Sequence, residues 1–124
     1  EVYRELALKG AEVIVCASAF LSPRFDHWEF FLRARATENQ CWVVASGQYG
    51  VEPQSGIAFV GRSMVVDPWG TVVATASDEE GVITTDIDLN FAEEIKRRYP
   101  LMDQRRPDMY GHIGKPKDQV PLYK

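Results

Sequence analysis

Two cysteines and two histidines are the side chains in this sequence best suited to nucleophilic or metal chemistry. Cys41 follows Glu38 by three residues, which suggests a thiol beside a carboxylate base. However, Cys41 opens an apolar run, where cysteine usually behaves as a small buried hydrophobe, and Cys16 lies in a similar run. The histidines, His27 and His112, are 85 residues apart and lack neighbours at metal-ligand spacing. We therefore expect no catalytic residue among these side chains, no metal site and no cofactor.

Length and composition predict a single globular domain. The 124 residues are 45% hydrophobic and 26% charged, which provides enough apolar surface for a core and excludes a disordered chain. No apolar run approaches the ~18 residues of a membrane helix, and the first residues lack the basic and apolar regions of a signal peptide. Two cysteines make no disulfide framework. These features predict a cytoplasmic protein with no membrane partner.

The charge is uneven along the chain. The net charge is −4, but residues 95–124 hold eight Lys and Arg against three Asp and Glu, a local +5 that leaves −9 on the rest. A basic tail is compatible with nucleic-acid binding. The acidic body instead repels phosphate and favours an arm packed on an acidic surface of its own or a neighbouring subunit. The prolines predict an extended arm over residues 100–124 and no nucleic-acid partner.

Hydrophobic periodicity predicts helices and strands that alternate at first and then give way to clustered strands. The first expected helix follows the apolar pattern of residues 2–7 and stops at Gly10. The other two cover residues 26–40 and 90–99 and are opened by the capping patterns Asp26/Glu29 and Asn90/Glu93. The expected strands cover residues 12–17, 41–46, 63–66, 71–74 and 82–89. Four glycines and a proline predict a loop over 47–61, and Asp-Pro-Trp-Gly predicts a turn over 67–70. This order is typical of a layered α/β fold with a mixed sheet.

Several ordered blocks of sequence resemble the C-terminal half of the nitrilase superfamily, the carbon–nitrogen hydrolases. The blocks are Ala-Ser-Ala-Phe at 17–20, His-Trp at 27–28, Leu-Arg-Ala-Arg-Ala-Thr-Glu-Asn-Gln-Cys-Trp-Val-Val-Ala at 32–45, Gly-Arg-Ser-Met-Val-Val-Asp-Pro-Trp-Gly at 61–70 and Arg-Arg-Pro-Asp-Met-Tyr-Gly at 105–111. The resemblance runs from residue 1 to about residue 114. Its closest branch is the small-amide amidases, which include the deaminated-glutathione amidases.

The resemblance implies the C-terminal half of a four-layer α-β-β-α sandwich with mixed sheets. It also implies hydrolysis of a small amide or nitrile by a Glu–Lys–Cys triad, through a thioester and without a cofactor. The family's cysteine would lie seven residues before Glu1, so we expect these residues 1–124 to form a partial hydrolase domain that is inactive alone. The alternative is a non-catalytic binding or assembly half-domain that pairs with another chain.

The same resemblance suggests which residues bind the substrate. Ser18, Ala19 and Phe20 follow the strand 12–17, and ligands of open α/β sheets bind at the carboxyl ends of strands. A small Ser-Ala pair permits close approach of the backbone, and Phe20 provides an apolar wall. The alternative is an irregular strand exit with no ligand. His27 is either a further substrate contact or a local hydrogen-bonding residue at the start of a helix.

Charged residues near this region have two possible roles each. Arg35 and Glu38 are spaced i, i+3 on one helix, which indicates a solvated ion pair, whereas the resemblance implies a buried support for the site or a subunit interface. Glu1 is a candidate partner for an arginine of this helix. Arg24 or Arg62 could bind a substrate carboxylate, or could lie on the surface.

The resemblance also implies a homo-oligomer, a dimer or higher, because the family packs its sandwiches through helices next to the site. The arm over residues 100–124 would then lie across the partner. Separation from the first half of the domain should expose one sheet face and leave one edge strand unpaired, which favours association of the isolated chain.

Overall fold

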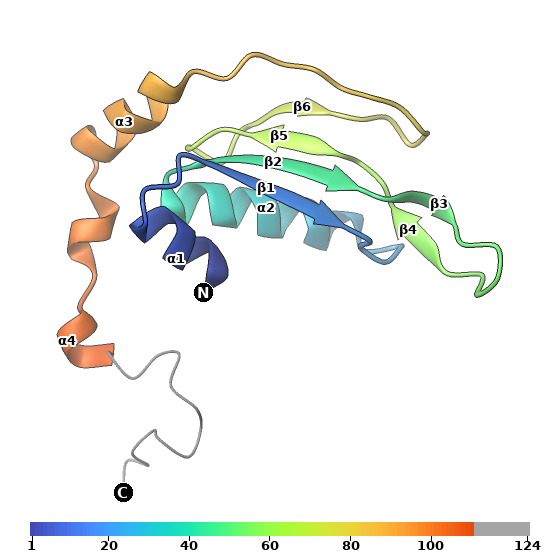
Figure 1. Cartoon of the computed structure of the whole chain (residues 1–124), viewed down its shortest axis with the longest axis horizontal. Helices are drawn as coiled ribbons and strands as arrows, with labels where there is room; N and C mark the ends of the chain where they lie inside the picture. The colour runs from blue at the N-terminus through green and yellow to red at the C-terminus, as the bar shows by residue number, and fades with distance from the viewer. Residues whose placement is uncertain (111–124) are drawn as a thin grey trace, which may run out of the picture.

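The computed structural model describes residues 1–110 and has a mixed α/β fold, as predicted from the order of elements (Figure 1). Its elements are α1 (Val2–Leu8), β1 (Val13–Ser18), α2 (Phe25–Asn39), β2 (Trp42–Gly47), β3 (Tyr49–Val51), β4 (Ala58–Val60), β5 (Met64–Val66), β6 (Val72–Thr75), α3 (Leu89–Arg98), the 3-10 helix η1 (Leu101–Gln104) and α4 (Pro107–Tyr110). None of the helices in this part of the chain is long and apolar enough to cross a membrane.

The main sheet has the strand order β1-β2-β5-β6 and is mixed, as expected. β1 and β2 are parallel, with Val13 opposite Trp42, because the crossover through α2 returns the chain to the same end of the sheet. β5 pairs antiparallel with both β2 and β6. β1 therefore stands at one edge, and its carboxyl end lies beside that of β2.

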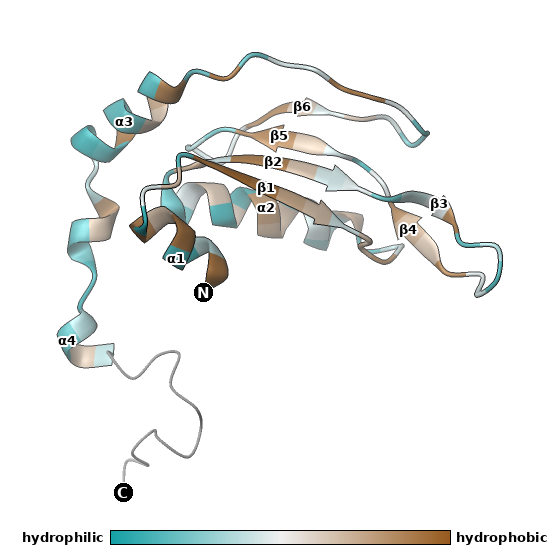
Figure 2. Ribbon diagram, viewed as in Figure 1, coloured by the Kyte–Doolittle hydropathy of each residue, from teal (hydrophilic) through white to brown (hydrophobic). Residues whose placement is uncertain are grey.

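One face of the sheet packs against α2 and forms the larger core. α2 contributes a stripe at helical spacing, Trp28, Leu32 and Ala36, each at most 3% exposed. The sheet side of this core comes from β2, β4 and β5, with residues Val43, Ala45, Val60, Met64 and Val66. The strands are hydrophobic along most of their length in Figure 2, as strands covered by other elements are.

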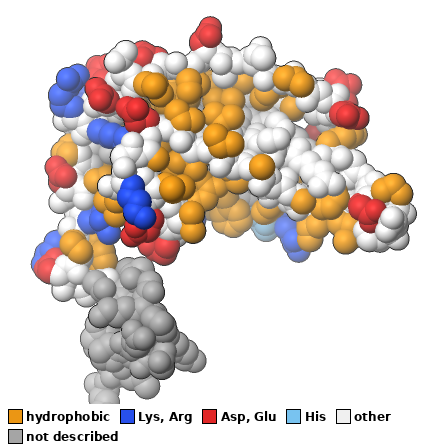
Figure 3. Space-filling view, in the orientation of Figure 1, with side chains coloured by type: hydrophobic (Ala, Val, Ile, Leu, Met, Phe, Trp, Pro, Cys, Tyr) orange, Lys and Arg blue, Asp and Glu red, His pale blue; other side chains and the backbone are white. Residues whose placement is uncertain are grey.

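The opposite face of the sheet is covered only at one end. There α3 packs Ala92 against Trp42 and Val65, and the Trp42 indole donates a 2.9 Å hydrogen bond to the Asp88 carbonyl. Further along the strands, Val15 is 73% exposed. Figure 3 shows hydrophobic side chains gathered on the face of the molecule toward the viewer. The structure therefore carries the exposed apolar sheet surface and the edge strand that the sequence predicted for a partial domain.

The turn between β5 and β6 confirms the sequence pattern Asp-Pro-Trp-Gly. The Asp67 carboxylate accepts hydrogen bonds from the backbone N–H groups of Trp69 and Thr71 at 2.8 and 2.9 Å. Gly70 adopts φ +83°, which a residue with a Cβ tolerates poorly. The turn thus follows from local chemistry alone.

The prediction of a loop over residues 47–61 is wrong, because this segment contains the two-stranded hairpin β3–β4. Tyr49 and Val51 pair antiparallel with Val60 and Ala58, and these residue types favour strands. The glycines are compatible with the hairpin, because Gly50 within β3, Gly56 at the tip and Gly61 after β4 take positive φ values. Gly47 allows a close backbone contact. Figure 1 shows the hairpin extending beyond the end of the main sheet.

Two further local expectations are wrong. Residues 82–89 alternate like a strand but form no ladder among the described residues, and only Ile83 and Ile87 are half-buried. α2 begins at Phe25 with no side-chain cap, and Asp88 rather than Asn90 caps α3 by accepting a bond from the Asn90 N–H. The missing ladder reflects the absence of a strand partner among the described residues, whereas the cap of α3 is a local bond formed two residues earlier than the expected one.

The segment predicted as an arm over 100–124 is described only up to Tyr110. Its first part contains the helical turns η1 and α4 and continues past the end of α2. The Gln40 side chain ties the start of this segment to the body with a 2.7 Å bond to the Tyr99 carbonyl. Residues 111–124, including His112, lie outside the described residues.

Replacing Gly47 with alanine tests the close contact at the root of the hairpin. A Cβ at this position would lie 2.1 Å from the Gly61 carbonyl oxygen, far inside van der Waals contact. We expect Gly47→Ala to lower the free energy of unfolding by about 2–3 kcal/mol. Gly81→Ala is the control, since nothing lies within 4 Å of its Cβ, and it should stay within about 0.5 kcal/mol of the original. Urea unfolding measures both, and equal values would contradict the contact.

Candidate functional site

The chain leaves β1 as an additional strand-like segment held by the hairpin. The Ser18 carbonyl accepts a bond from the Gln48 N–H, and the Phe20 carbonyl accepts one from the Val60 N–H, both at 2.9 Å. The Ser22 N–H then donates to the Ala58 carbonyl at 2.9 Å. We call residues 18–22 the exit loop. Its backbone is therefore fixed by the carboxyl end of β2 and by β4.

A cavity of about 350 Å³ opens where the exit loop, α1 and α2 meet. Its lining is mainly apolar and contains a few polar groups, as small-molecule sites usually do. The residues that line it are Tyr3, Cys16, Ser18, Phe20, Trp28, Phe31, Leu32 and Arg35. It lies at the carboxyl end of a parallel strand, where open α/β sheets bind ligands.

The four predicted substrate residues do not all reach this cavity. Ser18 and Phe20 line it, and the Phe20 ring lies 5.4 Å from the Trp28 ring. Ala19 is exposed and does not line the cavity, since side chains alternate along an extended segment. His27 is exposed on α2, where its ring lies 6.1 Å from that of Phe31. The structure thus brings two of the four residues together.

Three polar lining residues have no counterpart among the residues singled out as substrate contacts. Tyr3 comes from α1, Cys16 from the inner side of β1 and Arg35 from α2. Burial and then a hydrogen bond with the Cys16 side chain raise the pKa of Tyr3 to about 12, against a smaller lowering by the Arg35 charge. Tyr3 therefore remains a protonated hydroxyl at neutral pH. The sequence pattern predicted only that Tyr3 lies on a helix, and no sequence signal linked it to Cys16.

A charged network joins α1, α2 and η1 beside the cavity. Arg35 donates to the Glu38 carboxylate, and Arg4 lies 3.5 Å from the other oxygen of that carboxylate. Arg4 also donates to the Glu38 carbonyl at 2.6 Å and to the Met102 sulfur at 3.2 Å. The side chains are 24–41% exposed, so the predicted Arg35–Glu38 pair is present and half-buried. Glu1, the expected arginine partner, makes no ion pair among the described residues.

The remaining arginines proposed from the sequence lie away from the cavity. Arg62 binds Asp78 through two bonds of 2.7 and 2.9 Å, and its guanidinium lies 4.3 Å from the centre of the Phe25 ring. Arg24 is exposed at the start of α2. Since the Asp78 carboxylate already occupies the Arg62 fork, a second carboxylate there would have to displace it.

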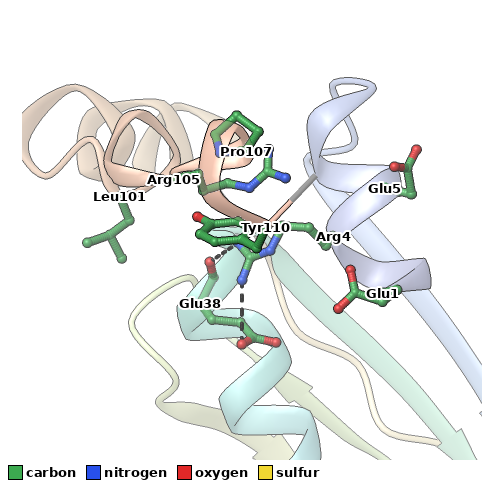
Figure 4. A pocket seen from close by; sticks show the side chains of 8 residues that line it. All are labelled: Glu1, Arg4, Glu5, Glu38, Leu101, Arg105, Pro107 and Tyr110. Atoms are coloured by element: carbon green, nitrogen blue, oxygen red, sulfur yellow. Dashed lines mark hydrogen bonds and ion pairs between the residues drawn. The ribbon is translucent and has the colours of Figure 1, made fainter. Parts of the chain in front are cut away.

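A larger cavity, of about 520 Å³, lies between α1, the end of α2 and the segment of η1 and α4 (Figure 4). The side chains of Arg4 and Arg105 enter it beside Glu38, together with Glu1 and Glu5. Two of its charged residues, Arg4 and Glu38, form an ion pair that joins α1 to α2. It lies away from the exit loop, so we regard the smaller cavity as the candidate site.

Cys41 does not have the surroundings of an activated nucleophile. Burial raises the pKa of the Cys41 thiol, which is fully buried and donates toward the Ala11 and Asn39 carbonyls. This position confirms the prediction of a structural cysteine. Within residues 1–110, no three His, Cys, Asp or Glu side chains gather in a way that could hold a metal ion.

The Tyr3 hydroxyl gives a pH signature of the cavity. Because the folded state raises this pKa from 10.0 to about 12, its stabilisation is complete below pH 10 and is lost as the pH rises toward 12. We expect one late-titrating phenol in ultraviolet absorbance, and Tyr3→Phe should abolish it and flatten the fall in unfolding free energy across this window. Tyr49→Phe is the control and should leave the late phase in place. A late phase that survives Tyr3→Phe would contradict the buried hydroxyl.

The sequence of this chain matches a known protein family and characterised members of it. A family model described as carbon-nitrogen hydrolase matches residues 1–97. The chain is 47% identical over 117 residues to the deaminated glutathione amidase of Homo sapiens, covering 94% of this chain and 36% of that protein. It is 40% identical over 110 residues to the 2-oxoglutaramate amidase of Bacillus subtilis (strain 168), covering 89% of this chain and 42% of that protein. The chain thus spans well under half the length of these relatives.

Solved structures agree with the sequence comparison. A carbon-nitrogen hydrolase from Helicobacter pylori G27 matches with a TM-score of 0.80 and 35% identity, over 90% of this chain and 43% of the other. The C. elegans NitFhit protein matches with a TM-score of 0.81 and 40% identity, over 88% and 26%. These neighbours confirm the predicted relation to the α-β-β-α fold. The chain therefore belongs to the carbon–nitrogen hydrolase family, the nitrilase superfamily that its sequence resembles.

Proposed function

We propose that this chain forms part of an amidase that hydrolyses a small amide and releases ammonia or an amine. The observation that carries the proposal is the cavity at the carboxyl end of β1, lined by Ser18 and Phe20 from the motif that resembles the family. The relatives named above as amidases support the same reaction class. A nitrile is the other substrate class that the family resemblance allows.

The chemistry divides between this chain and the segment that would carry the triad. In the family pattern a carboxylate takes the proton of a cysteine thiol, and the thiolate attacks the amide carbon. A lysine and a backbone N–H stabilise the charge on the substrate oxygen. The C–N bond then breaks, ammonia or an amine leaves with the proton held by the carboxylate, and water cleaves the resulting thioester. We propose that none of these groups comes from residues 1–124. Ser18 would contact the substrate with its hydroxyl, and Phe20 would exclude water and bound the acyl group.

The exposed sheet face supports the proposal that further polypeptide completes the domain. Val15, at 73% exposure, lies on the edge strand β1, whose outer side is unpaired among the described residues. Apolar side chains on an uncovered sheet face usually mark an interface. The same observation supports the alternative of a non-catalytic half-domain that pairs with another chain.

Two free cysteines, Cys16 and Cys41, fit a reducing compartment such as the cytoplasm.

We further propose that the protein is a homo-oligomer that associates through the outer side of α2. Phe30 lies on the side of this helix opposite the buried stripe and is 66% exposed. Trp69, at 48% exposure, continues the surface from the neighbouring turn. Large apolar side chains that gather on an exposed surface often mark an interface between proteins.

Ammonia release tests the proposed activity. We expect the full-length protein to hydrolyse some members of a panel of primary amides, with and without a carboxylate, and the 124-residue chain to hydrolyse none. Phe20→Ala in the full-length protein should lower kcat/KM by about tenfold or more, because the substrate loses an apolar wall. Thr85→Ala, exposed and away from the cavity, should leave it unchanged. Turnover by the 124-residue chain alone, or none by the full-length protein, would contradict the proposal.

Sedimentation of the full-length protein tests the proposed association. We expect a dimer or larger species, and Phe30→Glu should shift it toward the monomer because a charge would be buried at the interface. Val82→Glu, on an exposed residue elsewhere, is the control for added charge and should not shift it. A full-length protein that sediments as a monomer at all concentrations would rule out the proposal.

A further inference from the structure

The exit loop has a backbone that depends on the hairpin rather than on its own residues. Its three main-chain bonds go to Gln48, Val60 and Ala58, which are the residues at the root and along one strand of the hairpin. Leu21 and Phe59 add an isolated β-bridge. A shift of the hairpin would therefore carry the exit loop, and with it Phe20, in the same direction.

The root of the hairpin is a tight crossing of two chain segments. The Gly61 N–H donates to the Gln48 carbonyl at 2.8 Å, and the Gly47 N–H donates to the Ser63 hydroxyl at 3.1 Å. A Cβ on Gly61, which has φ +67°, would lie 2.8 Å from the Tyr49 ring. No side chain separates the two segments, so little relative movement is possible at this point.

The tip of the hairpin is also braced. The Glu52 carboxylate accepts bonds from the N–H groups of Gln54 and Ser55, at 3.0 and 2.6 Å. Hydrogen bonds from Ser55 and Gln54 hold the pKa of this carboxyl below its usual range. The hairpin is thus ordered at both ends by its own bonds, which suits it to hold another segment in place.

Trp28 connects this hairpin to the cavity. Its indole N–H donates a 2.9 Å bond to the Arg62 carbonyl, directly after the crossing, and its ring lies near the position of a Gly47 Cβ. On its other side the ring packs 5.4 Å from the ring of Phe20. Trp28 borders the cavity but is only 3% exposed, so its main contacts are with protein.

From these contacts we propose that Trp28 and the β3–β4 hairpin position Phe20, and thereby select the length of the acyl group that the amidase accepts. This inference rests on the proposed function. Phe20 is the contact residue, and Trp28 is a positioning residue that acts through it. Because Trp28 is held by the Arg62 carbonyl, loss of the indole N–H frees both aromatic rings and enlarges the cavity toward longer acyl groups.

The test compares two buried tryptophans that make the same kind of bond. Trp28→Phe removes the bond to the Arg62 carbonyl and keeps an aromatic ring beside Phe20. Trp42→Phe removes an equal 2.9 Å bond from a tryptophan that is 5% exposed, on the opposite face of the sheet. The loss of stability should therefore be similar in both variants.

The readout is the ratio of kcat/KM for hexanamide to that for propionamide in the full-length protein. We expect Trp28→Phe to raise this ratio about tenfold, which corresponds to room for about one further methylene of the longer acyl group, and Trp42→Phe to change it less than about twofold. Ser63→Ala, which loosens the hairpin root outside the cavity, is the milder variant and should raise the ratio about threefold. Equal ratios in all variants would overturn the proposal.

A second readout does not need activity. The backbone N–H groups of Val60 and Ser22 form the hydrogen bonds between the hairpin and the exit loop. Their hydrogen exchange should accelerate about tenfold in Trp28→Phe but not in Trp42→Phe. If exchange is faster in Trp28→Phe but the original protein hydrolyses no amide, the proposed function is wrong and the positioning role of Trp28 still holds. If the original protein hydrolyses amides but Trp28→Phe changes neither the exchange rates nor the kcat/KM ratio, the positioning role alone is wrong.

Discussion

The indole of Trp28 lies where α2, the exit from β1 and the hairpin come together. Its ring fills the space between the helix and the sheet, and its N–H satisfies the Arg62 carbonyl at the point where the chain returns from the hairpin. A buried polar group without a partner costs about 1–3 kcal/mol, and loss of a buried aromatic ring costs about 3–5 kcal/mol. Packing and hydrogen bonding at this residue therefore hold three elements in one arrangement, and the candidate cavity depends on it.

The sheet has two faces with different physical roles. The face toward α2 carries a continuous core from Trp28 to Val66 and gives the described chain its stability. The other face is covered by α3 at one end and exposes Val15 further along. Apolar side chains on an uncovered sheet face usually mark an interface.

The ion pairs have a secondary role. The Glu38 carboxylate forms ion pairs with Arg35 of its own helix, α2, and with Arg4 of α1. This one carboxylate therefore helps to fix the spacing of α1 and α2, which flank the cavity. Half-exposed pairs of this kind contribute about 1 kcal/mol or less. Their main effect is to orient the Arg35 side chain. Arg35 lines the cavity together with Tyr3 and Cys16, and these three residues provide polar groups in an otherwise mainly apolar lining.

The sequence alone determined the features that depend on near neighbours along the chain. The apolar runs predicted β1 and β2, and Asp67 predicted the turn before β6. Helical spacing predicts Trp28, Phe31 and Leu32 as the buried stripe of α2, which is right for Trp28 and Leu32, whereas Phe31 is 45% exposed. Ordered motifs were enough to predict the family and, through Ser18 and Phe20, one wall of the candidate site. All of these depend on residue type and on spacings of a few residues.

The tertiary structure decided what depends on contacts between distant segments. The residues from 47 to 61 became a hairpin because Tyr49 and Val60 could pair across a glycine-rich crossing, while the strand-like alternation of residues 82–89 found no pairing partner. Tyr3 entered the cavity, and His27 stayed outside it, because the orientation of α1 and α2 on the sheet sets which helix side faces inward. Local preferences are worth a few tenths of a kcal/mol per residue, so burial and pairing, which are larger, override them.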